Sequence, residues 1–121
     1  MKRLTYDTTI FPFKSVTEDY FNNTKLHLIH KDHPFKETLV YGTDQAQLLH
    51  RIFYDMMDGD VNQTFVNLYR RFIKKVIMPH YNFPVVFQRF PTLRVHQPSN
   101  IAVFGWHRDR EYNHSPDEIN F

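Results

Sequence analysis

The residues with the clearest chemical potential are His107 and Asp109, which follow the apolar run 101–106 and are separated by one residue. In an extended chain, residues two apart project to the same face, with Cα atoms roughly 6.5–7 Å apart. An imidazole nitrogen and a carboxylate oxygen can then bind one metal ion. These donors suit Fe(II) when a second histidine completes a 2-His-1-carboxylate triad. The spacing also fits a structural His–Asp pair.

Three stretches of different pattern have to position these two residues. Residues 1–42 are irregular, with prolines between short apolar groups, and predict loops and short strands. Residues 43–78 predict a helical hairpin, because apolar residues recur at helical spacing on both sides of Gly59 and Asp60 offers an N-cap. From residue 84 the apolar period changes to two, which predicts strands with short antiparallel connections as far as residue 121.

The helical hairpin has two expected faces. Its apolar stripes predict the buried core, to which Met57 is added: Leu49, Ile52, Phe53 and Met56 in the first helix, and Val61, Phe65, Leu68, Tyr69, Phe72, Val76 and Ile77 in the second. Opposite the second stripe lie four cations near the helix C-terminus, where the helix dipole favours positive charge: Arg70, Arg71, Lys74 and Lys75. We interpret them as a solvated face, with a patch for an anionic partner as the alternative.

Length and composition predict one soluble domain. The chain has 121 residues, of which 41% are hydrophobic, and a formal net charge of +2, which is too mild to predict nucleic-acid binding. No apolar run is long enough to span a membrane and no signal segment follows Met1, so we expect a cytoplasmic protein without membrane contacts. Since there is no cysteine, any metal site must use His, Asp or Glu.

The segments 88–100, 106–114 and 118–121 together resemble the 2-oxoglutarate/Fe(II)-dependent oxygenases, most closely the StrG-like group of streptomycin biosynthesis. The resemblance covers about a quarter of the chain. It implies an α+β fold, namely a partial double-stranded β-helix (a jelly roll, as in cupins) with the helical hairpin as outer support. It further implies that His107 and Asp109 bind Fe(II), that 2-oxoglutarate is the cosubstrate, and that a small molecule is oxidised while 2-oxoglutarate yields succinate and CO₂.

Two further polar residues are expected to bind the cosubstrate. Arg94 is a candidate for a bidentate contact with a carboxylate, and Asn120 for a hydrogen bond to cosubstrate or substrate. Both are also compatible with polar strand positions at the surface. In such oxygenases the distal histidine and the basic residue for 2-oxoglutarate lie further downstream, so this chain is expected to be the N-terminal part of one. His96 and His114 are the local candidates for the third ligand.

Other functions stay open on the sequence alone. If the barrel is incomplete, a second copy or a second chain is expected to complete it, and the protein is then a non-catalytic or partner-dependent half-barrel. A cupin-type metal-binding protein using His96, His107 and Asp109 is a second alternative, and it predicts metal binding without dependence on 2-oxoglutarate.

Overall fold

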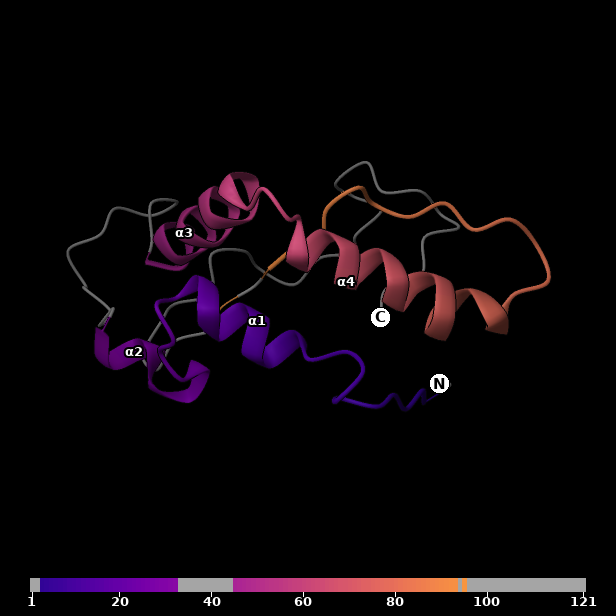
Figure 1. Cartoon of the computed structure of the whole chain (residues 1–121), viewed down its shortest axis with the longest axis horizontal. Coiled ribbons are helices and arrows are strands. Elements are labelled where there is room, and N and C mark those ends of the chain that lie inside the picture. Colours follow the sequence, from indigo (N-terminus) through magenta and orange to yellow (C-terminus); the bar gives the residue numbers. More distant parts are fainter. Residues whose placement is uncertain (1–2, 33–44, 94, 96–121) are drawn as a thin grey trace, which may run out of the picture.

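The computed structural model describes residues 3–32, 45–93 and 95 of the chain (Figure 1). More than half of these residues are helical. The elements are α1 (Phe13–Tyr20), the 3₁₀ turn η1 (Leu26–Leu28), α2 (Ile29–Asp32), α3 (Gln45–Gly59), α4 (Thr64–Phe72), the π-helical turn η2 (Ile73–Ile77) and the 3₁₀ turn η3 (Met78–His80). Among these elements, none has the length and apolar character needed to cross a membrane.

The two helices expected between residues 43 and 78 are present as α3 and α4. Helix α3 ends at Gly59, and Asp60 then accepts hydrogen bonds from the backbone N–H groups of Asn62 at 2.9 Å and Thr64 at 2.7 Å. These bonds satisfy donors at the start of α4, although Asp60 lies before Gln63, which occupies the N-cap position. The sequence therefore located the break between the helices correctly.

The second helix is less regular than expected. After Phe72 it continues as the π-helical turn η2 and then as η3, which contains Pro79. Because proline has no N–H and its ring crowds the preceding turn, a regular α-helix cannot continue through this position. In Figure 1, α4 leads away from α3 instead of returning along it. Helix α1 packs against both.

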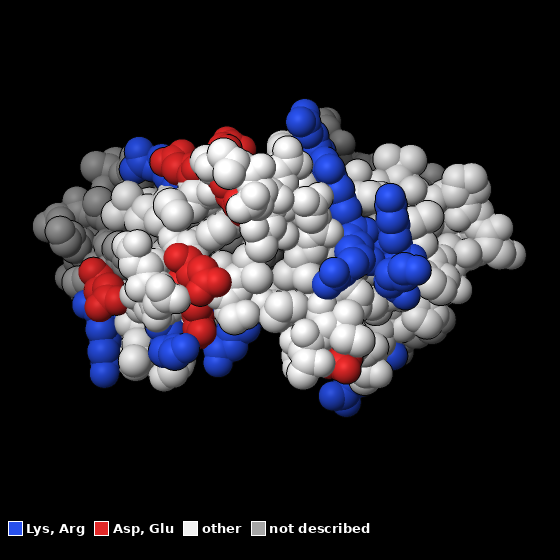
Figure 2. All heavy atoms as spheres, in the orientation of Figure 1, with Lys and Arg blue, Asp and Glu red and all other residues white. Residues whose placement is uncertain are grey.

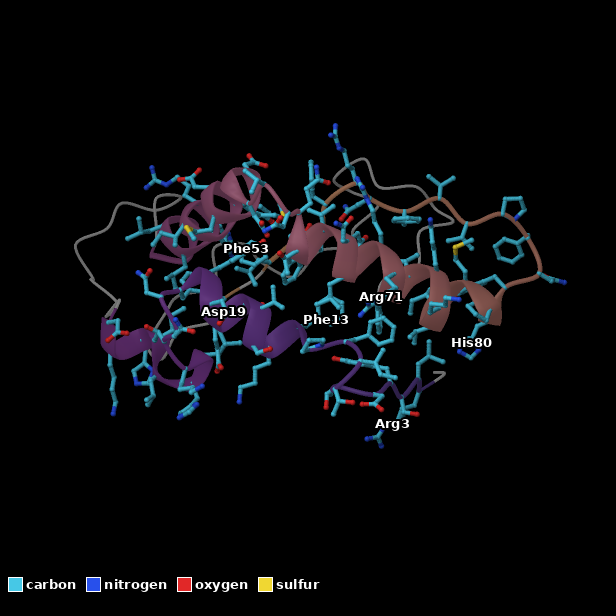
Figure 3. The ribbon with its side chains drawn as sticks, in the orientation of Figure 1. Arg3, Phe13, Asp19, Phe53, Arg71 and His80 are labelled. Carbon is cyan, nitrogen blue, oxygen red and sulfur yellow. The ribbon has the colours of Figure 1, made fainter. Side chains whose placement is uncertain are left out.

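An aromatic cluster joins the three longer helices. Tyr20 of α1, Phe53 of α3 and Phe65 of α4 are buried, with ring centroids 4.9–6.1 Å apart. Tilted and edge-on rings at this spacing add to the stabilisation from buried apolar area. Around these rings the core also contains Leu49, Met57, Val66, Phe21 and Ile29. Figure 3 shows Phe53 in the region between α1 and α3.

A second aromatic cluster fixes the N-terminal segment. Tyr6, Phe11 and Phe13 each lie edge-on to Phe72, at centroid distances of 5.0, 5.5 and 5.3 Å. Arg71 adds a hydrogen bond to the carbonyl oxygen of Ile10 at 2.7 Å. The segment that precedes α1 is therefore held against α4.

The prediction of strands in residues 1–42 is wrong for the part that the structure describes. Phe13–Tyr20 is helix α1, and the apolar group at residues 26–29 forms η1 and the start of α2. Backbone hydrogen bonds begin immediately at Pro12, whose carbonyl accepts from the Val16 N–H at 3.1 Å. Proline thus precedes a helix here because its fixed φ suits a helix start.

The predicted α+β class with a partial double-stranded β-helix is also wrong for the described residues, which contain no β-strand. Residues 84–93 have the period-two pattern, and Val85 and Phe87 are half-buried while Val86 is exposed. This segment packs on a helix, because the ring of Phe87 lies edge-on to Tyr69 of α4 with 5.9 Å between the ring centroids. The alternation therefore reflects packing on a helix and not pairing in a sheet. The other predicted strands, at 101–106 and 118–121, lie outside the described residues.

Candidate functional site

The predicted metal and cosubstrate residues lie outside the part of the chain that the structure describes. This applies to His107, Asp109, Arg94 and Asn120, and to the alternative ligands His96 and His114. Among residues 3–32, 45–93 and 95, no group of three or more His, Asp or Glu residues could hold a metal ion. What the structure does define is the segment that leads into these positions and the helices that support it.

Tyr54 anchors the chain immediately before Arg94. Its hydroxyl accepts a hydrogen bond from the Leu93 N–H at 3.0 Å and donates one to the carbonyl oxygen of Pro91 at 3.3 Å. Leu93 and Val95 are partly buried against the helical core. One side chain of α3 therefore takes over the hydrogen bonds that a neighbouring strand would otherwise provide to this backbone.

No sequence pattern directly indicated this role for Tyr54. It lies next to Phe53 in the predicted helix and outside the predicted apolar stripe. A half-buried tyrosine needs a partner for its hydroxyl, which is the only general signal that pointed to an anchoring contact. The partner itself follows from the way residues 84–93 pack back onto the helices.

A second group that sequence analysis missed is the carboxylate of Glu18, which is only 5% exposed. Its Oε1 accepts a hydrogen bond from the Leu26 N–H at 3.1 Å, and its Oε2 accepts one from the Lys25 ammonium at 3.2 Å. The Leu26 hydrogen bond is the main reason why the pKa of Glu18 is lowered; burial acts in the opposite direction, and Lys25 and Lys14 add to the lowering. Glu18 is therefore an ionised carboxylate that ties α1 to η1.

The pair formed by Tyr20 and Asp60 is also structural. The Tyr20 hydroxyl donates to Asp60 Oδ2 at 2.9 Å, and burial together with this contact raises the pKa of Tyr20 to about 12. Burial favours a higher pKa for Asp60, but the hydrogen bonds from Thr64, Tyr20 and Asn62 outweigh it and lower the value. At neutral pH the phenol is protonated and the carboxylate ionised, so neither is suited to proton transfer.

The described residues also form an open cavity of about 290 Å³ between the N-terminal segment and the start of α1. Its walls are mixed, with aromatic rings on one part and polar groups on another: Tyr6, Thr8, Phe11, Pro12, Phe13, Lys14, Ser15 and Glu18. Figure 3 shows Phe13 and Arg71 where this segment meets α4. Glu18, the acidic residue of this wall, already accepts hydrogen bonds from the Leu26 N–H and the Lys25 ammonium.

Comparison with known proteins identifies a homologue. The chain is 32% identical over 120 residues to the streptomycin biosynthesis protein StrG of Streptomyces griseus, and the alignment covers 98% of this chain. The similarity is thus broader than the resemblance in residues 88–121. The chain spans 55% of the length of that relative. No protein-family model matches the chain, and no solved structure is significantly similar to it.

Proposed function

We propose that this chain acts in the biosynthesis of a small molecule related to streptomycin, as part of an Fe(II)- and 2-oxoglutarate-dependent oxygenase. The observation that carries the first half of the proposal is the 32% identity with StrG over 98% of the chain. The second half rests on the donor set His107–Asp109 and on the oxygenase-like segments around it. The proposal does not require a jelly-roll arrangement of the described residues, which are helical.

The donor chemistry fits the proposed metal. Imidazole nitrogen and carboxylate oxygen are ligands that non-haem Fe(II) accepts, and this chain has no cysteine that would select a softer metal. His107 and Asp109 would bind the ion, and His96, His114 or a residue of another chain would supply the third ligand. When bound, Fe(II) would supply, with 2-oxoglutarate and O₂, the oxidation of the substrate: one oxygen atom of O₂ would enter the substrate and the other would enter the succinate that forms as CO₂ leaves 2-oxoglutarate.

The other proposed residues orient the organic molecules. Arg94 would bind a carboxylate of 2-oxoglutarate through its guanidinium group, because two parallel N–H···O bonds give both affinity and a fixed orientation. Asn120 would donate or accept a hydrogen bond to cosubstrate or substrate. The hydrogen bonds of Tyr54 support this role of Arg94, because they fix the backbone at Pro91 and Leu93, directly before it in the chain.

An anaerobic Fe(II) titration of the purified chain tests the proposed site. We expect binding that 2-oxoglutarate strengthens, and at least about tenfold weaker binding in His107→Ala and Asp109→Ala, since each variant loses one of the two assigned ligands. His27→Ala is the matched control, because His27 is an exposed histidine of η1.

Three results would separate the possible failures of the site. Unchanged iron affinity in both variants rejects the site. Binding that depends on both residues but not on 2-oxoglutarate indicates a simple metal-binding protein. An equal loss of Fe(II) affinity in His27→Ala shows that the titration detects nonspecific binding of iron to histidine side chains.

A further inference from the structure

The outer surface of α4 and η2 has an unusual charge pattern. Four cations lie within six residues: Arg70, Arg71, Lys74 and Lys75. We call these four residues the α4 basic surface. The whole sequence between Asp60 and Asp109 contains no Asp or Glu that could neutralise them locally. Figure 2 shows Lys and Arg side chains gathered over α4, whereas the acidic side chains gather mainly over the other helices.

The backbone brings these cations together in pairs. Arg70 and Lys74, and likewise Arg71 and Lys75, are four residues apart and therefore neighbours on a helix surface, where like charges repel. The second member of each pair lies in the π-helical turn η2 (Ile73–Ile77). The hydrogen bonds of such a turn join residues five apart; π-turns are rare overall, but they occur often at functional sites.

The cations are accessible. Arg71, Lys74 and Lys75 are exposed, and Arg70 is half-exposed. Arg71 is oriented by its hydrogen bond to the Ile10 carbonyl and lies 5.3 Å from the centre of the Phe11 ring. In the described part of the chain the ion pairs are those of Lys14 and Lys25 with Glu18, so no described carboxylate neutralises the α4 basic surface.

Exposed apolar side chains lie in the segment that follows η3. The contact between Tyr69 and Phe87 places residues 84–90 beside α4. In this segment Val86 is 96% exposed, and Phe83, just before it, is 57% exposed. Figure 1 shows the segment after η3 running back along α4. Burying an exposed valine against an apolar side chain of a partner is favourable, whereas contact with a phosphate backbone provides no such stabilisation.

We propose that the α4 basic surface, together with Val86 and Phe83, binds an acidic protein segment that also carries apolar side chains. Charge complementarity identifies the acidic part of the partner and Val86 identifies its apolar part. Two observations favour a protein segment over a nucleic acid: the net charge of only +2 gives little general attraction for a long polyanion, and Val86, the more exposed of the two apolar side chains, cannot stack on bases as Phe83 can. The cavity of about 290 Å³ is lined by other residues, so the partner lies on an open surface.

Fluorescence anisotropy with a labelled synthetic peptide tests this proposal. The probe is a 20-residue peptide of Glu and Leu at helical spacing, and its counterpart has Gln in place of Glu. We expect the acidic peptide to bind, the Gln peptide to bind at least about tenfold more weakly, and the affinity to fall as salt is raised.

Charge-reversal variants locate the surface. The double variant Lys74→Glu/Lys75→Glu is expected to weaken binding at least about tenfold. Lys31→Glu/Arg51→Glu changes the net charge equally at exposed positions of α2 and α3, and it is expected to stay within about twofold of the original affinity. Val86→Ser is expected to weaken binding of the Glu–Leu peptide about threefold or more.

Four results would overturn the proposal. Absence of binding rejects the docking surface. An equal loss in both charge-reversal variants shows a net-charge effect without a defined surface. Full affinity in Val86→Ser removes the apolar part of the recognition. Tighter binding of a single-stranded oligonucleotide of 20 nucleotides than of the acidic peptide assigns the surface to nucleic acid instead. Circular dichroism of each variant verifies that the helices are intact.

Discussion

Replacing Tyr54 by Phe removes one hydroxyl group and keeps the ring. In the structure this hydroxyl accepts from the Leu93 N–H at 3.0 Å and donates to the Pro91 carbonyl at 3.3 Å. A typical hydrogen bond contributes about 0.5–1.5 kcal/mol net, and a buried donor left without a partner costs about 1–3 kcal/mol. Because the site is only partly buried and the second bond is long, we expect Tyr54→Phe to lower the free energy of unfolding by about 1–2 kcal/mol.

Urea unfolding followed by circular dichroism measures this loss. With a slope of about 2 kcal/mol per molar urea, the unfolding midpoint should fall by roughly 0.5–1 M. Tyr6→Phe is the matched control: Tyr6 is 43% exposed and its ring contacts with Phe11, Phe13 and Phe72 do not use the hydroxyl. Its expected change is below about 0.5 kcal/mol.

Hydrogen exchange shows whether the effect is local. In Tyr54→Phe the Leu93 amide should exchange faster. The protection of the Phe53 amide in α3 should fall by no more than the free energy of global unfolding falls. If Tyr54→Phe and Tyr6→Phe have equal stability and the Leu93 amide is unchanged, the anchoring of residues 91–93 by α3 is refuted.

Three other predictions concern single groups. Since burial and Asp60 raise the pKa of Tyr20 to about 12, folding is favoured while this phenol is protonated; stability should fall by about 1–2 kcal/mol between about pH 10 and 12 after allowance for solvent screening, and this fall should be smaller in Tyr20→Phe in urea titrations at each pH. Because the pKa of Glu18 is lowered, its contribution is present above the unfolded value of about 4.5 and lost as pH falls below it; Glu18→Gln should therefore be less stable than the original at pH 7 and more nearly equal at pH 2. Gln63 has φ of 50°, so Gln63→Gly should raise the free energy of unfolding by about 0.5 kcal/mol, and with it the thermal midpoint, whereas Gln63→Val should lower both. The opposite order would show that the left-handed backbone at this position carries no strain.

The apolar pattern predicted the two central helices and most of the residues that they bury, with two exceptions. Leu49, Phe53 and Met57 are buried as expected, yet Met56, which was also expected in the core, is 43% exposed. The buried row follows four-residue steps, 49, 53 and 57, because α1 packs against that side. Val61, placed in the second stripe, is 92% exposed because it precedes the first residue of α4. Only the neighbouring helix decides between adjacent apolar residues.

Helix α1 was missed although its signal is present. Phe13, Val16, Thr17 and Tyr20 have helical spacing, and all four are at least half-buried. The prolines nearby favoured a loop interpretation, whereas Pro12 in fact precedes the first turn. The error in residues 84–93 has a different cause: a period of two reports two unequal environments along an extended chain, and here one of them is a helix surface.

The proposed site was predicted from the sequence alone. His107, Asp109, Arg94 and Asn120 lie outside the described residues, so their roles stay predictions. What the structure adds is the anchor before Arg94, which no sequence pattern indicated. The anchor depends on contacts of Tyr54 with Pro91 and Leu93, which lie 37 and 39 positions further along the sequence, and such pairings follow from the packing of the whole chain.

The most direct measurement of the proposed function is succinate formation by the purified chain with Fe(II), 2-oxoglutarate and O₂. A complete site predicts succinate that depends on all three additions and disappears in His107→Ala and in Asp109→Ala. Succinate at the same rate in both variants would contradict the assigned ligands. Succinate that forms equally without Fe(II) or without O₂ would contradict the oxygenase assignment.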